Sequence, residues 1–356
     1  MLKSLKIENF RCFPSFEMQQ LGRLNLIVGT NNSGKTSILE AIQLLIALPT
    51  NHAILSDITV DRSEYIKENS DIHLAIRHLF YNHKIDEGDQ ISIIGTDYND
   101  KLEQTLIKGQ KNRENGSPEL YILHLDDVEN RVQNTSLWLP ISQDGIIIID
   151  SQRKANWEKS FSRLPPKTRF VSSSSFSSEQ MIELFERIVI TPEEDLVIES
   201  LKIIEPRIKR IANVNSGKYR YDGAHSGFIA QLTDEIQRVP ISSMGDGMWR
   251  MLGLALAIVN AKDGVLLVDE IDTGLHFTVM SDMWKMLWET AKRLNVQIFA
   301  TTHSNDCWKS LADIADAENP SEDGIMIHRI EKGKTKSIVF TEDEIAIAAE
   351  EGIEVR

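Results

Sequence analysis

The segment Gly29-Thr30-Asn31-Asn32-Ser33-Gly34-Lys35-Thr36 has the pattern G-x-x-x-x-G-K-[ST], which is the strongest indication of the fold in this sequence. It follows a short apolar run, Leu24 to Val28, that predicts a buried strand. It also begins a stretch with apolar residues at helical spacing, Ser33 to Ala47, that predicts a helix. Glycines between a strand and a helix let backbone N–H groups surround phosphates at the helix N-terminus. The segment therefore predicts a site for the phosphates of a nucleotide.

The residues of this loop have different predicted roles. Lys35 is expected to contact the β- and γ-phosphates, and Thr36 is expected to ligate Mg²⁺. We also expect Gly29, Asn31, Asn32, Ser33 and Gly34 of the segment, and Ser37 directly after it, to bind the nucleotide. The cofactors implied are ATP and Mg²⁺.

A second acidic motif follows the apolar run Val265 to Val268, which predicts another buried strand. Asp269 and Glu270 come directly after it, where ligands bind in an open α/β sheet. We expect Asp269 to hold Mg²⁺ through water and Glu270 to act as the base that orients the attacking water. Two acids after an apolar strand can also be a simple polar turn, but their combination with the glycine loop favours function.

The spacing of the two motifs excludes a compact kinase or a small GTPase, since Lys35 and Asp269 are 234 residues apart (269 − 35). From about residue 51 to 170, short apolar runs alternate with polar turns, which predicts a β-rich elaboration. From 171 to 239 we expect a helical insertion. Its helices should begin at the capping boxes Ser177–Gln180 and Thr191–Glu194, and the second should continue through Ile208 and Ile211.

Composition limits the setting in which the protein works. The 356 residues include 41% hydrophobic side chains and carry a formal net charge of −14, so contact with nucleic acid is expected only at a local patch. The two cysteines, Cys12 and Cys307, lack metal-ligand spacing and fit a reducing compartment. Charged residues interrupt the longest apolar stretch, and the first residues do not form a secretory signal. We expect a cytoplasmic protein without membrane contact.

A third motif, Ser242-Ser243-Met244-Gly245-Asp246-Gly247, opens a predicted helix, and Ser243 precedes Asp269 by 26 residues (269 − 243). It resembles the signature motif of ABC-type ATPases, in the divergent form of RecF-like, SMC-like and overcoming-lysogenisation-defect (OLD) proteins. The resemblance implies an α/β fold, an ABC-type P-loop ATPase head with a β-rich N-terminal lobe and a helical insertion. It also implies a head-to-tail dimer, in which Ser243 and Gly245 contact the γ-phosphate held by the other subunit. From the residues alone, an ordinary helix cap is the alternative.

Two further segments support this resemblance. Asp272 to His276 occupies the place of the D-loop, although His276 stands where transporters usually carry aspartate. The strand ending Thr301-Thr302-His303 resembles the one that carries the switch histidine, so the implied catalytic residues are Lys35, Glu270 and His303. Phe10 and Arg11 resemble the edge near adenine, which makes Arg11 a candidate nucleotide-binding residue. The Q-loop glutamine is not identifiable.

The domain organisation we expect is a single ATPase unit over residues 1–356. Its nucleotide-binding core comprises 1–50 and 240–340. The β-rich elaboration spans 51–170, and the helical insertion spans 171–239.

Four functions remain open from the sequence. The first is an ATP-driven homodimer or larger homo-oligomer in phage defence or DNA maintenance. It would act with a separately encoded nuclease-like effector, because the chain ends soon after His303 and we expect no Toprim nuclease domain. The second is a RecF-like repair clamp that binds DNA itself. The third, disfavoured by His276, is the nucleotide-binding subunit of a transporter; a non-hydrolysing scaffold is disfavoured by Glu270.

Overall fold

The computed structural model describes residues 1–68, 71–112, 114–128, 131–149, 168–173, 176–214, 227–233, 237–315 and 323–356. Residues 150–167 of the predicted β-rich elaboration and residues 174 and 175 of the predicted helical insertion lie outside this range. The chain divides into two compact units. The first comprises Met1–Gly22, Val28–Thr168 and His328–Val339, and the second comprises Arg23–Ile27, Arg169–Ile327 and Phe340–Arg356.

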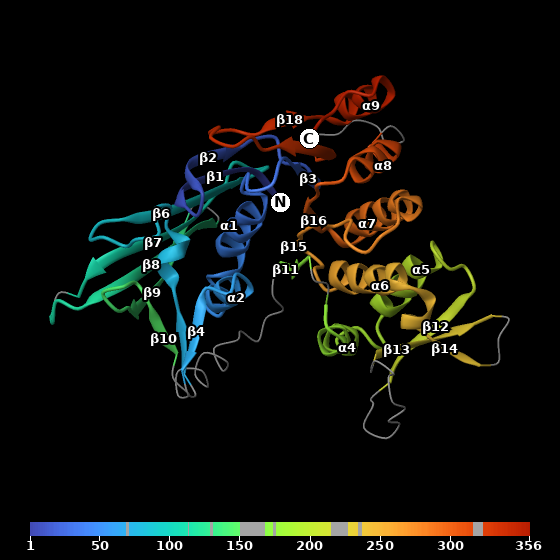
Figure 1. The fold of residues 1–356 in the computed structure, drawn as a ribbon, viewed down its shortest axis with the longest axis horizontal. Helices are drawn as coiled ribbons and strands as arrows, with labels where there is room; N and C mark the ends of the chain where they lie inside the picture. Colours follow the sequence, from blue (N-terminus) through green and yellow to red (C-terminus); the bar gives the residue numbers. More distant parts are fainter. Residues whose placement is uncertain are drawn as a thin grey trace. The chain divides into compact units, whose positions relative to one another are not determined.

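An antiparallel sheet dominates the first unit, with the strand order β2-β1-β6-β7-β8-β9 (Figure 1). Its strands are β1 (Leu2–Phe10), β2 (Phe13–Met18), β6 (Gln90–Asp97), β7 (Leu102–Lys111), β8 (Pro118–Val128) and β9 (Arg131–Pro140). The helix α1 (Lys35–Ala47) packs on β1, β6 and β7. Its apolar residues recur at helical spacing, so they form the buried face that the sequence predicts.

Shorter elements complete the first unit. A small antiparallel sheet has the order β10-β5-β4. The elements are α2 (Ile54–Asp61), β4 (Tyr65–Glu68), β5 (Asp71–Leu74), the 3₁₀ helix η1 (Ile76–Leu79) and β10 (Ile147–Ile149). The strands agree with the predicted β-rich character, whereas α2 was not predicted from the sequence.

The second unit contains the parallel strands that the sequence predicts. The sheet runs in the order β11-β15-β16-β3-β17, and β15, β16 and β3 are parallel neighbours. The strands are β3 (Leu24–Val28), β11 (Thr168–Val171), β15 (Val265–Val268), β16 (Gln297–Thr301) and β17 (Ile325–Arg329), followed by β18 (Ile338–Phe340). By the bounds given above, the end of β17 and most of β18 are assigned to the first unit. All residues of β3, β15 and β16 are buried, so their continuous apolar runs are explained. The α/β fold class is confirmed.

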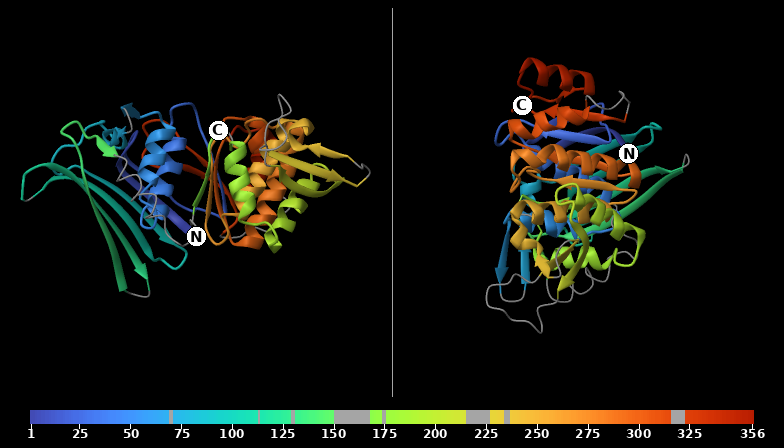
Figure 2. Two further views of the ribbon diagram at one scale, coloured as in Figure 1. Left: turned by 90° about the horizontal axis from the view of Figure 1, so that it is seen from below. Right: turned by 90° about the vertical axis from the view of Figure 1, so that its right-hand side faces the viewer.

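Helices accompany this sheet and lie side by side in both figures (Figures 1 and 2). They are α4 (Ser178–Glu186), α5 (Pro192–Lys202), α6 (Asp246–Val259), α7 (Met280–Leu294), α8 (Asn305–Ala315) and α9 (Glu342–Glu351), with the 3₁₀ helices η2 (Ile241–Met244) and η3 (Phe277–Val279). Among the described helices, none has both the length and the apolar character that crossing a bilayer would require.

The segment between β11 and η2 differs from the predicted helical insertion. The capping box of Ser177 and Gln180 opens α4 as predicted. The helix α5 instead ends at Lys202, and Ile208 and Ile211 belong to a strand. Three strands form an antiparallel sheet in the order β12-β13-β14: β12 (Ile208–Val214), β13 (Gly227–Leu232) and β14 (Arg238–Pro240). The predicted second box does not form either, because Thr191 makes no side-chain cap and its hydroxyl donates to the Ile188 carbonyl.

Candidate functional site

The glycine loop of the first unit requires glycine at two positions. Gly29 has a φ of 146°, and a Cβ there would lie 2.4 Å from the carbonyl oxygen of Ile330. Gly34 has a φ of 100°, and a Cβ there would lie 2.3 Å from Cζ of Phe13 and 2.6 Å from Sγ of Cys12. Both the backbone conformation and the close neighbours therefore exclude other residues. The helix α1 begins immediately after this turn, as a phosphate-binding loop requires.

Polar groups of the same loop fit a bound phosphate. Lys35 is buried, and its Nζ donates to the carbonyl oxygens of Gly29 (2.9 Å) and Thr30 (3.0 Å). The Ser33 hydroxyl is buried, with no hydrogen-bond partner in the described part of the chain. A buried hydroxyl normally has a partner, and a phosphate oxygen is an acceptor of the right kind.

The remaining residues of the loop lie in different environments. Asn31 and Asn32 are exposed, and Asn32 has a φ of 59°, a left-handed conformation that asparagine tolerates well. Thr36 is half-buried at the start of α1. Ser37 is buried, and its hydroxyl accepts a hydrogen bond of 3.4 Å from Arg62. The nucleotide contacts predicted for these residues stay predictions.

Arg11 lies in a buried ion-pair network of the first unit. Its Nε donates to Glu40 at 2.9 Å, and its Nη1 donates to Glu64 at 2.6 Å. Arg62 binds the second oxygen of Glu40 at 2.6 Å. Burial raises the pKa of the Glu40 carboxyl, while the two arginines act in the opposite direction. These contacts link the segment after β1 to α1 and to the segment after α2, so a structural role accounts for Arg11, and its predicted contact with the nucleotide stays a prediction.

The acidic pair of the second unit follows β15, as predicted. The N–H of Asp269 donates to the carbonyl oxygen of Val171 at 2.8 Å. Glu270 has a φ of 47°, a left-handed conformation that costs about 1–2 kcal/mol in a residue with a side chain. Its N–H donates to Oγ1 of Thr301 at 2.8 Å, and its carbonyl oxygen accepts a bond of 3.2 Å from Arg250. Bonds on both sides of the residue thus hold this unusual backbone in place.

Two threonines to which the sequence analysis assigned no role make short contacts with Asp269 and Asp272. The buried Thr301 hydroxyl donates to Oδ1 of Asp269 at 2.6 Å while it accepts the N–H of Glu270. The buried Thr302 hydroxyl donates to Oδ1 of Asp272 at 2.6 Å and accepts the N–H of Ser304. The feature of the sequence that could have identified these threonines is their position at the end of the run that forms β16, which is the parallel neighbour of β15.

His303 follows these threonines between β16 and α8. Its carbonyl oxygen accepts a hydrogen bond of 2.6 Å from Nη1 of Arg356. Val355, next to that arginine, is fully buried. The structure thus brings Asp269, Glu270 and the segment of His303 to the carboxyl ends of adjacent strands, where ligands bind in parallel sheets.

The predicted signature residues lie at the start of α6. Gly245 has a φ of 102°, and no heavy atom would lie within 4 Å of a Cβ there, apart from its own neighbours. Ser243 is exposed in η2, and its hydroxyl donates to the carbonyl oxygen of Pro240 at 2.7 Å. The N-terminus of α6 therefore opens on free space, which is what the approach of a phosphate from outside the unit would need.

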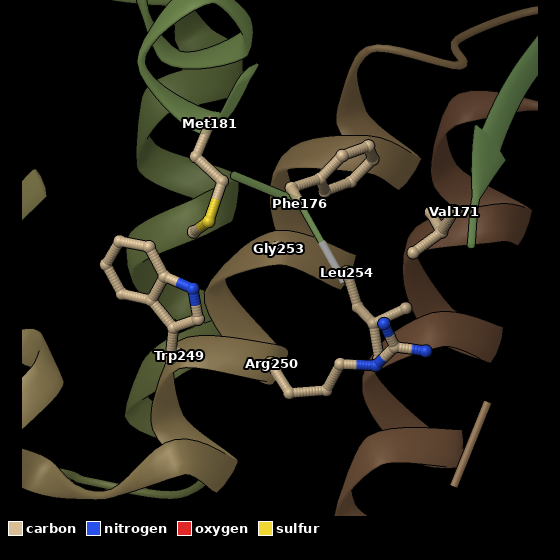
Figure 3. A pocket seen from close by; sticks show the side chains of 7 residues that line it. All are labelled: Val171, Phe176, Met181, Trp249, Arg250, Gly253 and Leu254. Atoms are coloured by element: carbon tan, nitrogen blue, oxygen red, sulfur yellow. The ribbon is translucent and has the colours of Figure 1, made fainter. Parts of the chain in front are cut away.

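Arg250 connects α6 to the acidic pair. Its Nη1 donates to the carbonyl oxygen of Ser172 at 3.2 Å, besides the bond to Glu270. Burial lowers the pKa of Arg250, and the nearby Asp272, Asp269 and Glu270 raise it. Arg250 also lines a small pocket together with Trp249, Met181 and Phe176 (Figure 3). This pocket has no room even for a water molecule, so it is too small to be the nucleotide site.

Comparison with protein families gives one match that covers most of the chain. The model described as "AAA ATPase domain" matches residues 1–307. A protein of Helicobacter pylori named "ATP/GTP phosphatase" is 23% identical over 329 residues, and the alignment covers 86% of each chain.

Two shorter sequence matches and a similarity to solved structures were also found. The "OLD nuclease" of Thermus scotoductus is 50% identical over 46 residues, which are 13% of this chain and 8% of that protein. "DNA replication and repair protein RecF" of Clostridioides difficile is 46% identical over 44 residues, 12% of each chain. Among solved structures, the SMC head domain of Thermotoga maritima is 14% identical with a TM-score of 0.45, covering 96% of this chain and 98% of that one.

Proposed function

Since the chain belongs to the AAA ATPase domain family, we propose that its ATP hydrolysis drives a switch in which two copies bind ATP head to tail. The family confirms the predicted ATPase activity. The local similarities to the OLD nuclease and to RecF confirm the predicted resemblance to this group of ATPases. The observation that carries the catalytic part of the proposal is the left-handed Glu270, which Thr301 and Arg250 fix directly after Asp269.

The proposed reaction is the transfer of the γ-phosphoryl group of ATP to water. Lys35 and the N–H groups of the glycine loop bind and orient the phosphates. Thr36 and Asp269 are the residues that would hold Mg²⁺, since a hydroxyl and a carboxylate are oxygen ligands that this ion prefers. Mg²⁺ supplies neutralisation of the charge that develops on the phosphate oxygens. Glu270 accepts a hydrogen bond from the attacking water and takes its proton, and His303 donates to the γ-phosphate.

The dimeric arrangement rests on the start of α6. Ser243 and Gly245 are exposed, and the space in front of Gly245 is open. In the proposed dimer these residues contact the γ-phosphate bound by the second copy, where the partial positive charge of the helix N-terminus favours it. Hydrolysis removes that phosphate and so weakens the contact between the copies. ATP thereby sets how long the dimer lasts.

For the biological role we propose phage defence or DNA maintenance, together with a separately encoded nuclease-like effector. The support is the similarity to a nuclease of the OLD type and to a replication and repair protein. The similarity to RecF also favours a second candidate, a repair clamp that binds DNA by itself. The two differ in whether the chain needs a separate effector to act on DNA.

Phosphate release tests the catalytic part of this proposal. Glu270→Gln keeps the size of the side chain and removes its basicity, so we expect the turnover rate to fall by about 10²- to 10⁴-fold. Glu350→Gln makes the same charge change on the exposed side of α9 and should retain the wild-type rate. A Glu270→Gln variant that releases phosphate at the wild-type rate would contradict the assigned role.

A further inference from the structure

One exposed surface departs from the acidic character of the chain. Acidic residues outnumber lysine and arginine by 53 to 39. The outer face of the sheet β12-β13-β14 nevertheless carries cations. In the pairing of β12 with β13, Arg210 lies opposite Gln231, and in the pairing of β13 with β14, Gln231 lies opposite Arg238. The three residues therefore form one row across the strands. All three are exposed. We name Arg210, Gln231 and Arg238 the arginine row.

The burial pattern shows that this row faces away from the core. Ile211 and Ala230 are paired across the strands and buried, as are Ile208 and Leu232, so they form the inner face. The next row on the outer face consists of Ala212, Ile229 and Pro240, which are small or apolar. Lys209, at the irregularity of β12, is also exposed. No acidic residue occurs in the described parts of these three strands.

The arginines of this row make no ion pair in the described part of the structure. In contrast, Arg187 pairs with Glu183 and Arg293 pairs with Glu199, although these residues are also exposed. The backbones of Arg210 and Arg238 are two interstrand spacings apart, a distance of about 10 Å. Duplex DNA has one phosphate on each strand for about every 3.4 Å of helix axis, so both guanidinium groups can reach phosphates of one strand at once. The Gln231 amide between them is another common phosphate donor.

We propose that the arginine row binds the phosphodiester backbone of nucleic acid. Arginine suits phosphate because its planar guanidinium group forms two parallel hydrogen bonds with phosphate oxygens. A flat face with a continuous row of donors fits an extended polyanion better than a single small anion, which needs an enclosing site. The inference rests on the proposed role in DNA maintenance, but it concerns a surface distinct from the catalytic residues and is tested without hydrolysis.

The test compares two double variants with the same loss of charge. Arg210→Gln with Arg238→Gln removes the row, whereas Arg187→Gln with Arg293→Gln removes two arginines that pair with glutamates. Binding of a labelled DNA duplex, and of one of its single strands, is measured by fluorescence anisotropy between about 50 and 200 mM salt. Each lost phosphate contact lowers the slope of log K against log salt by about 0.9 on duplex DNA and about 0.7 on single strands. The row variant should lose about two contacts, and the control should match wild type.

Three results would overturn the inference. In the first, both variants lose the same affinity, so that only net charge matters. In the second, the wild-type chain binds neither form of DNA. In the third, it binds polyglutamate of equal charge as tightly as DNA, which would indicate an acidic protein partner. Phosphate release without DNA is measured in parallel, so a failure of the proposed ATPase switch is recognised separately from a failure of the arginine row.

Discussion

Thr301 contacts both members of the acidic pair through one hydroxyl group. It donates to Asp269 and accepts from Glu270, so it fixes the carboxylate expected to hold Mg²⁺ relative to the base expected to act on water. Groups that orient a metal ligand in this way typically change metal affinity or activity by 10- to 100-fold when they are removed, on the order of 1–3 kcal/mol. The residue is therefore a positioning residue in this account, and Thr302 has the corresponding place for Asp272.

Thr301→Val tests that role. Valine has nearly the same shape and also suits a strand, but it removes the hydroxyl that donates to Asp269 and accepts from the N–H of Glu270. We expect turnover to fall by about 10- to 100-fold and the Mg²⁺ concentration for half-maximal rate to rise. Thr301→Ser retains the hydroxyl and should restore most of the activity.

A buried threonine elsewhere provides the control for this prediction. Thr59 is fully buried, and its hydroxyl donates only to the backbone of Leu55. Thr59→Val should leave the Mg²⁺ dependence at the wild-type value. If Thr301→Val also leaves it there, or if Thr301→Ser is as impaired as Thr301→Val, the positioning role is refuted.

At the scale of elements, the regular strands and helices next to the motifs were predictable. Leu24 to Val28 and Val265 to Val268 are short apolar runs without breaks, and a fully buried parallel strand needs such a run. The second helix of the insertion was predicted too long, because Ile208 and Ile211 continue the helical spacing. Pro206 gives the physical reason for its earlier end, since the residue before proline avoids the helical conformation.

Contacts between distant segments were not predictable from periodicity. Arg11, Glu40, Arg62 and Glu64 come from separate stretches of the chain, and only folding brings them into one network. The glycine loop and the acidic pair were found because their local pattern reflects their chemistry. Thr301 and Thr302 were missed because a hydroxyl becomes a positioning group only through the neighbouring strand.

The buried His328 of the strand β17 should make the stability of the fold depend on pH. Burial lowers the pKa of His328 to about 3, whereas in the unfolded chain it is about 6.5. The unfolded state therefore binds more protons between these values, and the stability contributed above pH 6.5 is lost as the pH falls. From pH 7 to pH 5 the free energy of unfolding should decrease by about 2 kcal/mol through this residue.

Urea unfolding at the two pH values measures the effect. His328→Gln should lose that part of the pH dependence, whereas His83→Gln, which changes an exposed histidine, should keep it. An unchanged pH dependence in His328→Gln would show that this residue does not couple folding to protonation.

For the whole molecule, the sequence predicts a single unit, whereas the structure divides into two compact units. Each unit contains some of the predicted site residues. The glycine loop belongs to the first unit, and the acidic pair, the signature residues and His303 belong to the second. The strand β3 of the second unit continues along the chain into the glycine loop. The division of the chain into core, β-rich elaboration and insertion stays a proposal, as do the cytoplasmic location, the effector and the dimer.

The solution mass of Glu270→Gln with ATP and Mg²⁺ shows whether two copies associate through ATP. The chain has a mass of 40.4 kDa. We expect this variant, which should bind ATP without hydrolysing it, to double its mass with ATP but not with ADP, and we expect an added Ser243→Arg substitution to abolish the doubling. A mass that is the same with ATP, with ADP and without nucleotide would contradict an ATP-dependent association of two copies.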